Sequence, residues 1–136
     1  MTPFAISIAI DALCIVGLYA AITMQAKAAR YARGEPLEPS VVQTPRARVF
    51  GNVPNSAFGI AYYLLLLPGA WLLHIPAVFY AMLIAVALAA GFSAYLAYSL
   101  LFVTRMQCTM CWTGHAVNWS LLAIMAYAAV EALKNV

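Results

Sequence analysis

The chain has 136 residues, of which 66% are hydrophobic and 8% are charged, and its net charge is +3. Soluble domains carry about 25% charged residues, so this composition excludes an ordinary water-soluble globule. It indicates a protein embedded in the lipid bilayer. The small net charge comes from few residues, so we expect no nucleic-acid partner.

Four apolar runs approach the length of about 20 residues that crosses a bilayer as a helix. They cover residues 4–26, 57–74, 77–103 and 108–131. The first run has no basic segment before it and is long enough to span, so we interpret it as a retained helix rather than a cleavable signal peptide. The predicted fold is an all-α integral membrane protein, a four-transmembrane-helix bundle that forms one domain over residues 1–136.

The connection between the first two predicted helices, residues 27–56, is long and rich in Pro, Lys and Arg. We expect one long loop there, lying on the membrane surface. The other connections are short, so neighbouring helices are antiparallel. The loop, the start of the second helix and the start of the fourth helix should therefore share one membrane face.

The segment QCTMCW, residues 107–112, places Cys108 and Cys111 in a C-x-x-C at the start of the fourth predicted helix. Unpaired amides and the macrodipole at a helix N-terminus favour a thiolate, the form that exchanges with disulfides. The plainer alternative is a pair of buried apolar cysteines. We interpret Cys14, within an apolar stretch of the first helix, as an inert packed cysteine.

His115 lies on the same helical face as the two cysteines. It could hydrogen-bond beside a redox pair or ligate a soft metal together with both cysteines. A closed zinc site requires a fourth ligand, which the sequence does not bring near, so we predict no metal. Asn55, at the entry to the second helix, is a candidate donor into the same pocket, and its alternative role is to cap that helix.

These motifs, taken together and in this order, resemble the vitamin K epoxide reductase family of four-helix membrane thiol–quinone oxidoreductases. The resemblance extends over nearly the whole chain and is more specific than the C-x-x-C alone. The segments that carry it are CIVGLYA with KAAR at the end of the first helix, RVF, NSAFG, CTMC and AVNWSLL.

The resemblance implies a role for each residue of the site. Cys108 would exchange with an external dithiol and Cys111 would face a membrane quinone, in support of disulfide formation. The quinone would be ubiquinone, menaquinone or a vitamin K-like compound. Its binding residues would be two hydrogen-bond donors and three walls of the ring pocket, in that order Asn55 and His115, then Phe50, Phe58 and Tyr62.

The chain departs from the family pattern at two places. His115 stands where the family often has a tyrosine, and it can still donate a hydrogen bond. The long loop lacks the two cysteines that relay electrons in the family, and Arg46 stands at the place of one of them. We therefore expect the thiol donor, a thioredoxin-like protein or a small thiol, to react with Cys108 directly.

Two other functions are open at this point. One is a soft-metal binding or transport protein that uses Cys108, Cys111 and His115. The other is a non-catalytic quinone-binding subunit, because the loop cysteines are missing.

The resemblance and the charges give opposite orientations in the plasma (inner) membrane. Family members usually present this site to the periplasm, where disulfides persist. The positive-inside rule places it in the cytoplasm, because all but one of the seven basic residues lie on the site's face. These residues are Lys27, Arg30, Arg33, Arg46, Arg48 and Arg105.

Overall fold

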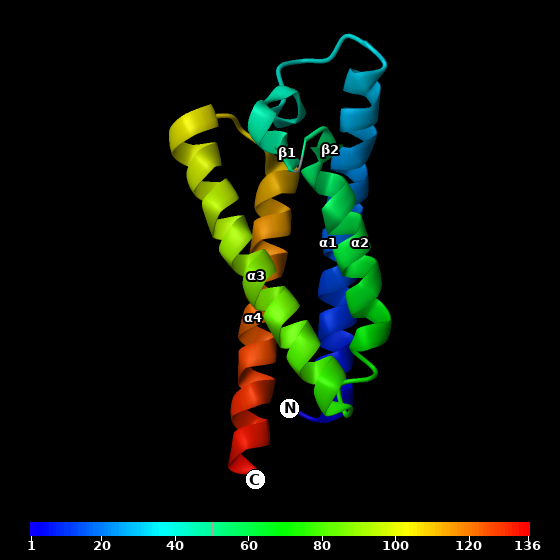
Figure 1. Cartoon of the computed structure of the whole chain (residues 1–136), viewed down its shortest axis with the longest axis vertical. Coiled ribbons are helices and arrows are strands. Elements are labelled where there is room, and N and C mark those ends of the chain that lie inside the picture. Colours follow the sequence, from blue (N-terminus) through cyan, green and yellow to red (C-terminus); the bar gives the residue numbers. More distant parts are fainter. Residues whose placement is uncertain (50) are drawn as a thin grey trace.

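The computed structural model describes residues 1–49 and 51–136, and it is mostly helical (Figure 1). Four α-helices are assigned in these residues: α1 (Pro3–Ala32), α2 (Asn55–Gly69), α3 (Pro76–Ser99) and α4 (Thr109–Lys134). A π-helical segment, η3 (Leu100–Thr104), continues α3. Between α1 and α2 lie two short 3-10 helices and two short antiparallel strands, η1 (Val41–Gln43), η2 (Pro45–Ala47), β1 (Arg48–Val49) and β2 (Val53–Pro54).

Three helical segments are long and apolar enough to cross a membrane: Pro3–Ala32, Pro76–Thr104 and Thr109–Lys134. The second helix was predicted over 57–74, and these bounds are wrong, because α2 has 15 residues and ends at Gly69. Pro68 lacks an amide hydrogen and glycine is a poor helix former, so the chain leaves the helix at this point. A fourth membrane span stays a prediction.

The first helix is longer than predicted, since it continues past residue 26 to Ala32. Ala, Lys and Arg are strong helix formers, so the charges of this segment end the apolar stretch without ending the helix. Gly34 then adopts a left-handed φ of +76° and turns the chain away. The predicted loop over 27–56 is correspondingly shorter and contains the η1, η2, β1 and β2 elements. The third and fourth helices differ from prediction by a few residues at their ends.

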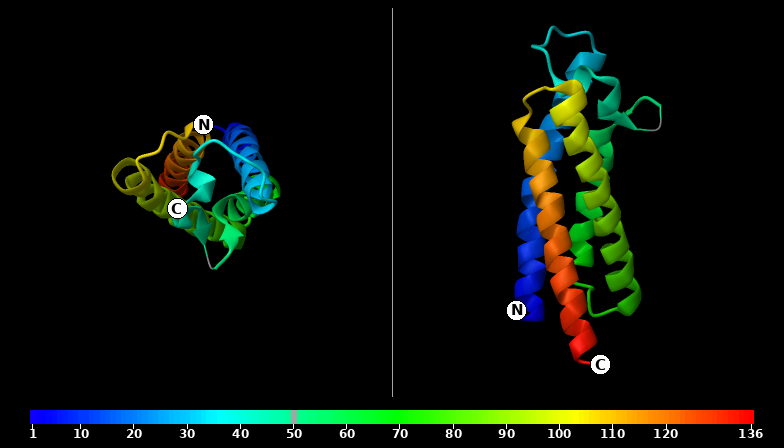
Figure 2. Two further views of the ribbon diagram at one scale, coloured as in Figure 1. Left: turned by 90° about the horizontal axis from the view of Figure 1, so that it is seen from above. Right: turned by 90° about the vertical axis from the view of Figure 1, so that its left-hand side faces the viewer.

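The helices form a bundle that is open at one end. Helix α1 packs against α2 and α4, and α3 packs mainly against α4. Helices α2 and α3 leave their connecting turn close together and then diverge (Figure 1). The segment between α1 and α2 lies across the open end, as the view from above in Figure 2 shows. The start of α4, which carries both C-x-x-C cysteines, lies at this same end.

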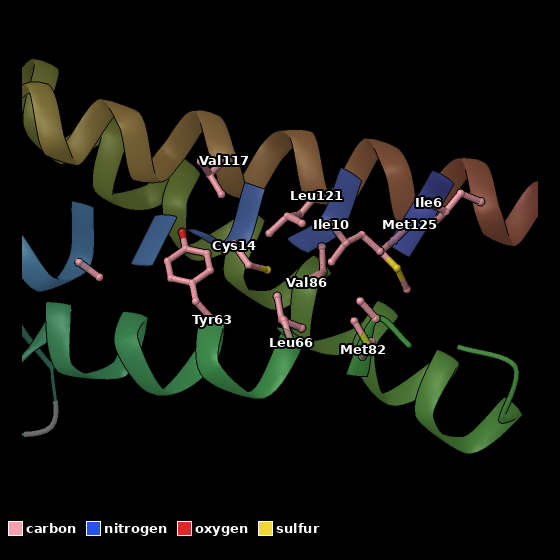
Figure 3. Close-up of a cluster of buried hydrophobic side chains, with 12 residues drawn as sticks. Ile6, Ile10, Cys14, Tyr63, Leu66, Met82, Val86, Val117, Leu121 and Met125 are labelled. Atoms are coloured by element: carbon pink, nitrogen blue, oxygen red, sulfur yellow. The ribbon is translucent and has the colours of Figure 1, made fainter. Parts of the chain in front are cut away.

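An apolar core fills the bundle away from the open end (Figure 3). Its fully buried members include Ile10, Val86, Leu121 and Met125. Cys14 is a free cysteine among them with 0% exposure, which confirms its interpretation as a packed residue. Polar contacts close the far end of this core, where Ser7 Oγ donates to the Ala70 carbonyl at 2.6 Å.

Tyr63 of α2 and Asn118 of α4 together connect all four helices. The Tyr63 hydroxyl donates to Asn118 Oδ1 on α4 at 2.9 Å, and Asn118 Nδ2 donates to Ser93 Oγ on α3 at 2.6 Å. The Tyr63 ring lies against Gly17 of α1, where an added Cβ would overlap the ring atoms. Tyr63 and Ser93 are 4% and 3% exposed, so water is not available to replace these hydrogen bonds.

The contact between Gly17 and Tyr63 predicts that Gly17→Ala destabilises the bundle. Overpacking of this kind costs about 1–3 kcal/mol, more than the gain in helix propensity of about 1 kcal/mol. Gly91→Ala is the matched control, because nothing lies within 4 Å of a Cβ there. Thermal unfolding in one detergent should show a lower Tm for Gly17→Ala and an unchanged or higher Tm for Gly91→Ala. Equal shifts in both variants would contradict the close packing of α1 on Tyr63.

The hydrogen-bonded chain through Asn118 predicts a loss of stability in Asn118→Leu. Interhelical hydrogen bonds in membranes contribute about 0.6–1.7 kcal/mol each, so the loss of two should cost about 1–2 kcal/mol. Ser120→Leu, at an exposed position on the same helix, serves as the control. Unfolding of Asn118→Leu combined with Tyr63→Phe should cost less than the sum of the single changes. Strict additivity would show that the two side chains do not act as a pair.

Candidate functional site

Cys108 and Cys111 are joined by a disulfide at the start of α4, with their Cα atoms 5.2 Å apart. Cys108 occupies the N-cap position, and its sulfur accepts a hydrogen bond from the Cys111 amide at 3.2 Å. The first amides of the helix have no partner within it, and they favour a thiolate once the disulfide is reduced. The alternative of two separate buried apolar cysteines is wrong, because the sulfurs are bonded and both residues are only partly buried.

A cavity of about 290 Å³ lies where α2 and α3 diverge, beside Cys111. The predicted site residues that line it come from the starts of α2 and α4 and are Asn55, Phe58, Tyr62, Cys111 and His115. Cys108 does not line this cavity. Phe50, the remaining predicted wall, lies outside the described residues. Tyr63, Ser93 and Asn118 also line the cavity, so the hydrogen-bonded chain described above forms its floor.

Three polar side chains around the cavity have unused hydrogen-bonding capacity. His115 is 7% exposed and lies between the rings of Trp112 and Trp119, with centroid distances of 5.8 and 6.1 Å. No residue in the described part of the chain hydrogen-bonds to its ring nitrogens or to the side-chain amide of Asn55. The Tyr62 hydroxyl is buried and has no hydrogen-bond partner among residues 1–49 and 51–136. Buried polar groups in proteins are normally paired, so a cavity with such groups is suited to a ligand that carries oxygen atoms.

The capping role considered for Asn55 is wrong. The N-cap position of α2 is held by Pro54, whose side chain makes no capping hydrogen bond, and Asn55 is the first helical residue. Ser56 does not cap the helix either, since its hydroxyl donates to Gln25 Oε1 on α1 at 2.7 Å. The Asn55 amide is therefore available to the cavity.

Arg46 fixes the inter-helix segment over the cavity. Its Nη1 donates to the Tyr95 hydroxyl at 3.0 Å and to Ser99 Oγ at 2.6 Å, and its guanidinium lies 5.7 Å from the Tyr95 ring centroid. Arg46 and Arg48 are the charged residues among those that line the cavity, and no carboxylate lines it. In the sequence, Arg46 stands out only as the residue at the place of a cysteine. The signal that was missed is the polar pair of Tyr95 and Ser99, one turn apart in a mostly apolar helix.

A second hollow, of about 680 Å³, lies on the other side of the cysteine pair. Cys108 lines it, together with residues from the end of α1, from the loop and from the start of α4, which include Lys27, Arg30, Glu38 and Thr109. Cys111 does not line this hollow. The disulfide therefore lies between two hollows, with Cys111 bordering one and Cys108 the other, while Met110 lines both.

Ion pairs hold the turn that follows α1 beside this second hollow. Glu35 accepts from Arg30 Nε at 2.8 Å and pairs with Arg33 at 2.9 Å. Hydrogen bonds from Arg30 and Arg33 lower the pKa of the Glu35 carboxyl below its ordinary value, so the charged form persists at neutral pH. These ion pairs hold Glu35 against the end of α1, directly before the loop residues that line the hollow.

The soft-metal alternative finds no support in this geometry. Among the described residues, no group of three or more His, Cys, Asp and Glu side chains is arranged to hold a metal ion. Cys108 and Cys111 are bonded to each other, and their two residues border different hollows.

Comparison with known proteins places the chain in a family. A comparison with curated proteins finds no match. The sequence profile of the Vitamin K epoxide reductase family matches residues 8–126, which contain both cysteines and every residue that lines the cavity. Because the match covers most of the chain, the protein belongs to the vitamin K epoxide reductase family, whose members are membrane oxidoreductases that typically use quinones.

Proposed function

We propose that the protein is a membrane thiol–quinone oxidoreductase. In this proposal the Cys108/Cys111 pair takes electrons from an external thiol and passes them to a membrane quinone. The observation that carries the proposal is the position of the disulfide between two hollows, with Cys111 bordering one and Cys108 the other. Electrons can enter at one residue and leave at the other without any movement of the helices.

The cavity beside Cys111 suits a quinone head group in size and chemistry. Its volume of about 290 Å³ is near the lower end of the range for ligand pockets, about 300–1,000 Å³. We assign Asn55 and His115 as donors to the two quinone oxygens, and Phe58 and Tyr62 as walls. We propose that an isoprenoid tail leaves the cavity between α2 and α3, which have few contacts with each other. Ubiquinone, menaquinone and vitamin K-like quinones share the features that this site would recognise.

The reaction follows from the order of the two residues. Cys111, as a thiolate, faces the quinone ring while Asn55 and His115 stabilise the oxygens on which negative charge develops. The Cys108 thiolate then bonds to the Cys111 sulfur, and the pair releases two electrons as the disulfide forms. The quinone oxygens take up two protons, as many as the two thiols released on forming thiolates, which balances the conversion of quinone to hydroquinone.

We also propose that α2 crosses the membrane, so that the bundle has four transmembrane helices. The 15 residues of α2 have a length of about 22 Å at 1.5 Å per residue, which is less than the hydrocarbon core of about 30 Å. The segment from 70 to 75 adds apolar residues and Trp71, a residue type common at membrane interfaces. Helix α1 is bound to this segment by the contact of Ser7 with Ala70.

The site end of the bundle faces the cytoplasm in this proposal. At the end of the bundle where α4 begins lie the end of α1, the segment between α1 and α2, and the turn before α4. These segments contain Lys27, Arg30, Arg33, Arg46, Arg48 and Arg105. Lys134 is the last residue of α4, at the other end of that helix. Basic residues near the ends of membrane spans favour the cytoplasmic side. The bilayer would be the plasma (inner) membrane.

Quinone titration of the reduced protein tests the activity. Purified protein, reduced and freed of reductant, should lose two thiols for each equivalent of a short-tailed quinone converted to hydroquinone. Cys108→Ser and Cys111→Ser should each abolish this stoichiometric reaction, because one thiol alone cannot form the internal disulfide. Thiols are counted by maleimide mass tagging and hydroquinone is measured by absorbance.

Cys14→Ser is the matched control for this titration, since Cys14 is buried in the core and should not contribute. A wild-type protein that binds quinone while both thiols persist would overturn the enzymatic proposal. That result would instead support the non-catalytic quinone-binding subunit.

Single cysteines on a cysteine-free background test the four-span topology and its orientation. Leu37→Cys lies in the loop and His74→Cys lies in the turn after α2. With an impermeant maleimide on intact cells, we expect His74→Cys to be labelled and Leu37→Cys to be protected until the cells are opened. The reverse pattern would keep four spans but place the site outside. Identical labelling of both positions would show that α2 does not cross.

A further inference from the structure

The hollow beside Cys108 contains chemistry that the proposed function leaves unassigned. Lys27 and Arg30 line it from the end of α1, and Glu38 lines it from the loop. The ammonium of Lys27 has no ion-pair partner in the described part of the chain, whereas Arg30 is paired with Glu35. Thr109 and Met110 also line the hollow, and their amides belong to the first turn of α4, which has no acceptors within the helix.

The electrostatics of this end favour an anion. The six basic residues at the site end face two acidic residues there, Glu35 and Glu38, which leaves a local excess of positive charge. A helix N-terminus adds amide donors and the positive end of the macrodipole. The excess positive charge and the helix N-terminus both lie near Cys108, the residue that reacts with the incoming thiol in the proposed function.

The shape of the hollow favours a small reactant. Its volume of about 680 Å³ is more than twice that of the quinone cavity at about 290 Å³. The loop residues Pro36, Leu37, Pro39 and Ser40 form one wall, and Cys108 is only partly exposed behind it. The volume lies within the range of small-molecule pockets, about 300–1,000 Å³, so a molecule of about the size of a tripeptide fits it.

From these features we infer that the hollow is a binding site for a low-molecular-mass thiol that carries carboxylate groups, with Lys27 and the first turn of α4 holding the carboxylate beside Cys108. This inference rests on the proposed function, since it names the electron donor of the same disulfide. It also explains how the pair is supplied with electrons in a chain whose loop lacks cysteines.

The reaction at this site is a thiol–disulfide exchange. The thiolate of the small molecule attacks Cys108 Sγ, the bond between Cys108 and Cys111 breaks, and Cys111 leaves as a thiolate. A second small thiolate then attacks the small molecule's sulfur in the mixed disulfide. Cys108 is released as a thiolate, and the oxidised small-molecule disulfide leaves. Two electrons and no net atoms are transferred to the protein, apart from the protons that the two cysteines take up.

The test measures how fast small thiols open the disulfide, with no quinone present. The oxidised protein, on a Cys14→Ser background, is treated with mercaptopropionate, mercaptoethanol or cysteamine, which are anionic, neutral and cationic at the non-sulfur end. Free thiols are trapped with maleimide over time, and each rate is expressed per thiolate. Wild type should prefer the anionic thiol over the cationic one, and added salt should reduce the preference.

Charge variants of the hollow separate binding from intrinsic thiol reactivity. Lys27→Gln should lower the ratio of anionic to cationic rates about two- to fivefold, the range of a partly exposed ion pair. Glu38→Gln should raise the ratio by a similar factor. Lys134→Gln, at the opposite end of the bundle, should leave the ratio unchanged. Differences in thiol reactivity cancel in these comparisons, because each variant is read against wild type with the same reagents.

Ratios that respond to neither Lys27→Gln nor Glu38→Gln would overturn the inference. So would rapid reduction by a thioredoxin-like protein together with small-thiol rates that show no charge preference. Both outcomes leave the proposed function standing, because quinone reduction by chemically reduced protein is measured separately. Conversely, a failed quinone titration would not alter these exchange rates. All three charge variants are at exposed positions, and a thermal unfolding curve of each confirms that it is folded.

Discussion

The pair of hydrogen bonds that runs from Tyr63 through Asn118 to Ser93 divides the bundle into two parts with different properties. On one side of it, apolar side chains pack into a continuous core. On the other side, α2 and α3 have diverged and the helices enclose a cavity. In a bilayer no water is available to satisfy these polar groups, so the three helices are held at one separation and one rotation. The positions of Asn55, Cys111 and His115 around the cavity all depend on that relation.

The site was largely predictable because it depends on local sequence order. A C-x-x-C followed by His115 fixes three side chains near the start of one helix, and the short connections bring the start of α2 to the same end. The position of Asn55 at the entry to the second helix made it a candidate donor, and the family resemblance then added Phe58 and Tyr62. All three line the same cavity as Cys111.

The parts that were missed depend on geometry that hydropathy does not encode. Hydropathy ended the first helix where charges begin, although the backbone continues as helix to Ala32. It also carried the second helix through Pro68 and Gly69, where the backbone turns. The contact of Arg46 with Tyr95 and Ser99 joins segments about 50 residues apart, and only the folded chain shows that they meet. The hydrogen bond from Asn118 to Ser93 likewise depends on how α3 and α4 are rotated about their axes.

In the segment between α1 and α2, Arg46 attaches the loop to α3 by hydrogen bonds. Arg46 stands where the resemblance places a redox cysteine. The attachment is polar and noncovalent, so it does not change with the redox state of the surroundings. In the proposed reaction, the cavity would then stay covered in both half-reactions, and the Cys108–Cys111 pair would carry all the electron transfer.

The placement of Cys108 and Cys111 on opposite hollows has a kinetic consequence. In the proposed reaction, a thiol reduces the disulfide from the hollow beside Cys108, and a quinone oxidises the thiols from the cavity beside Cys111. The second half-reaction therefore cannot begin until the first has reduced the pair. Such an arrangement implies ping-pong kinetics, with parallel lines in double-reciprocal plots. It also implies that an inhibitor seated in the lipid-side cavity acts competitively toward the electron acceptor alone. Under this proposal, the same partition would also keep a water-soluble reductant from reacting directly with a lipid-soluble oxidant.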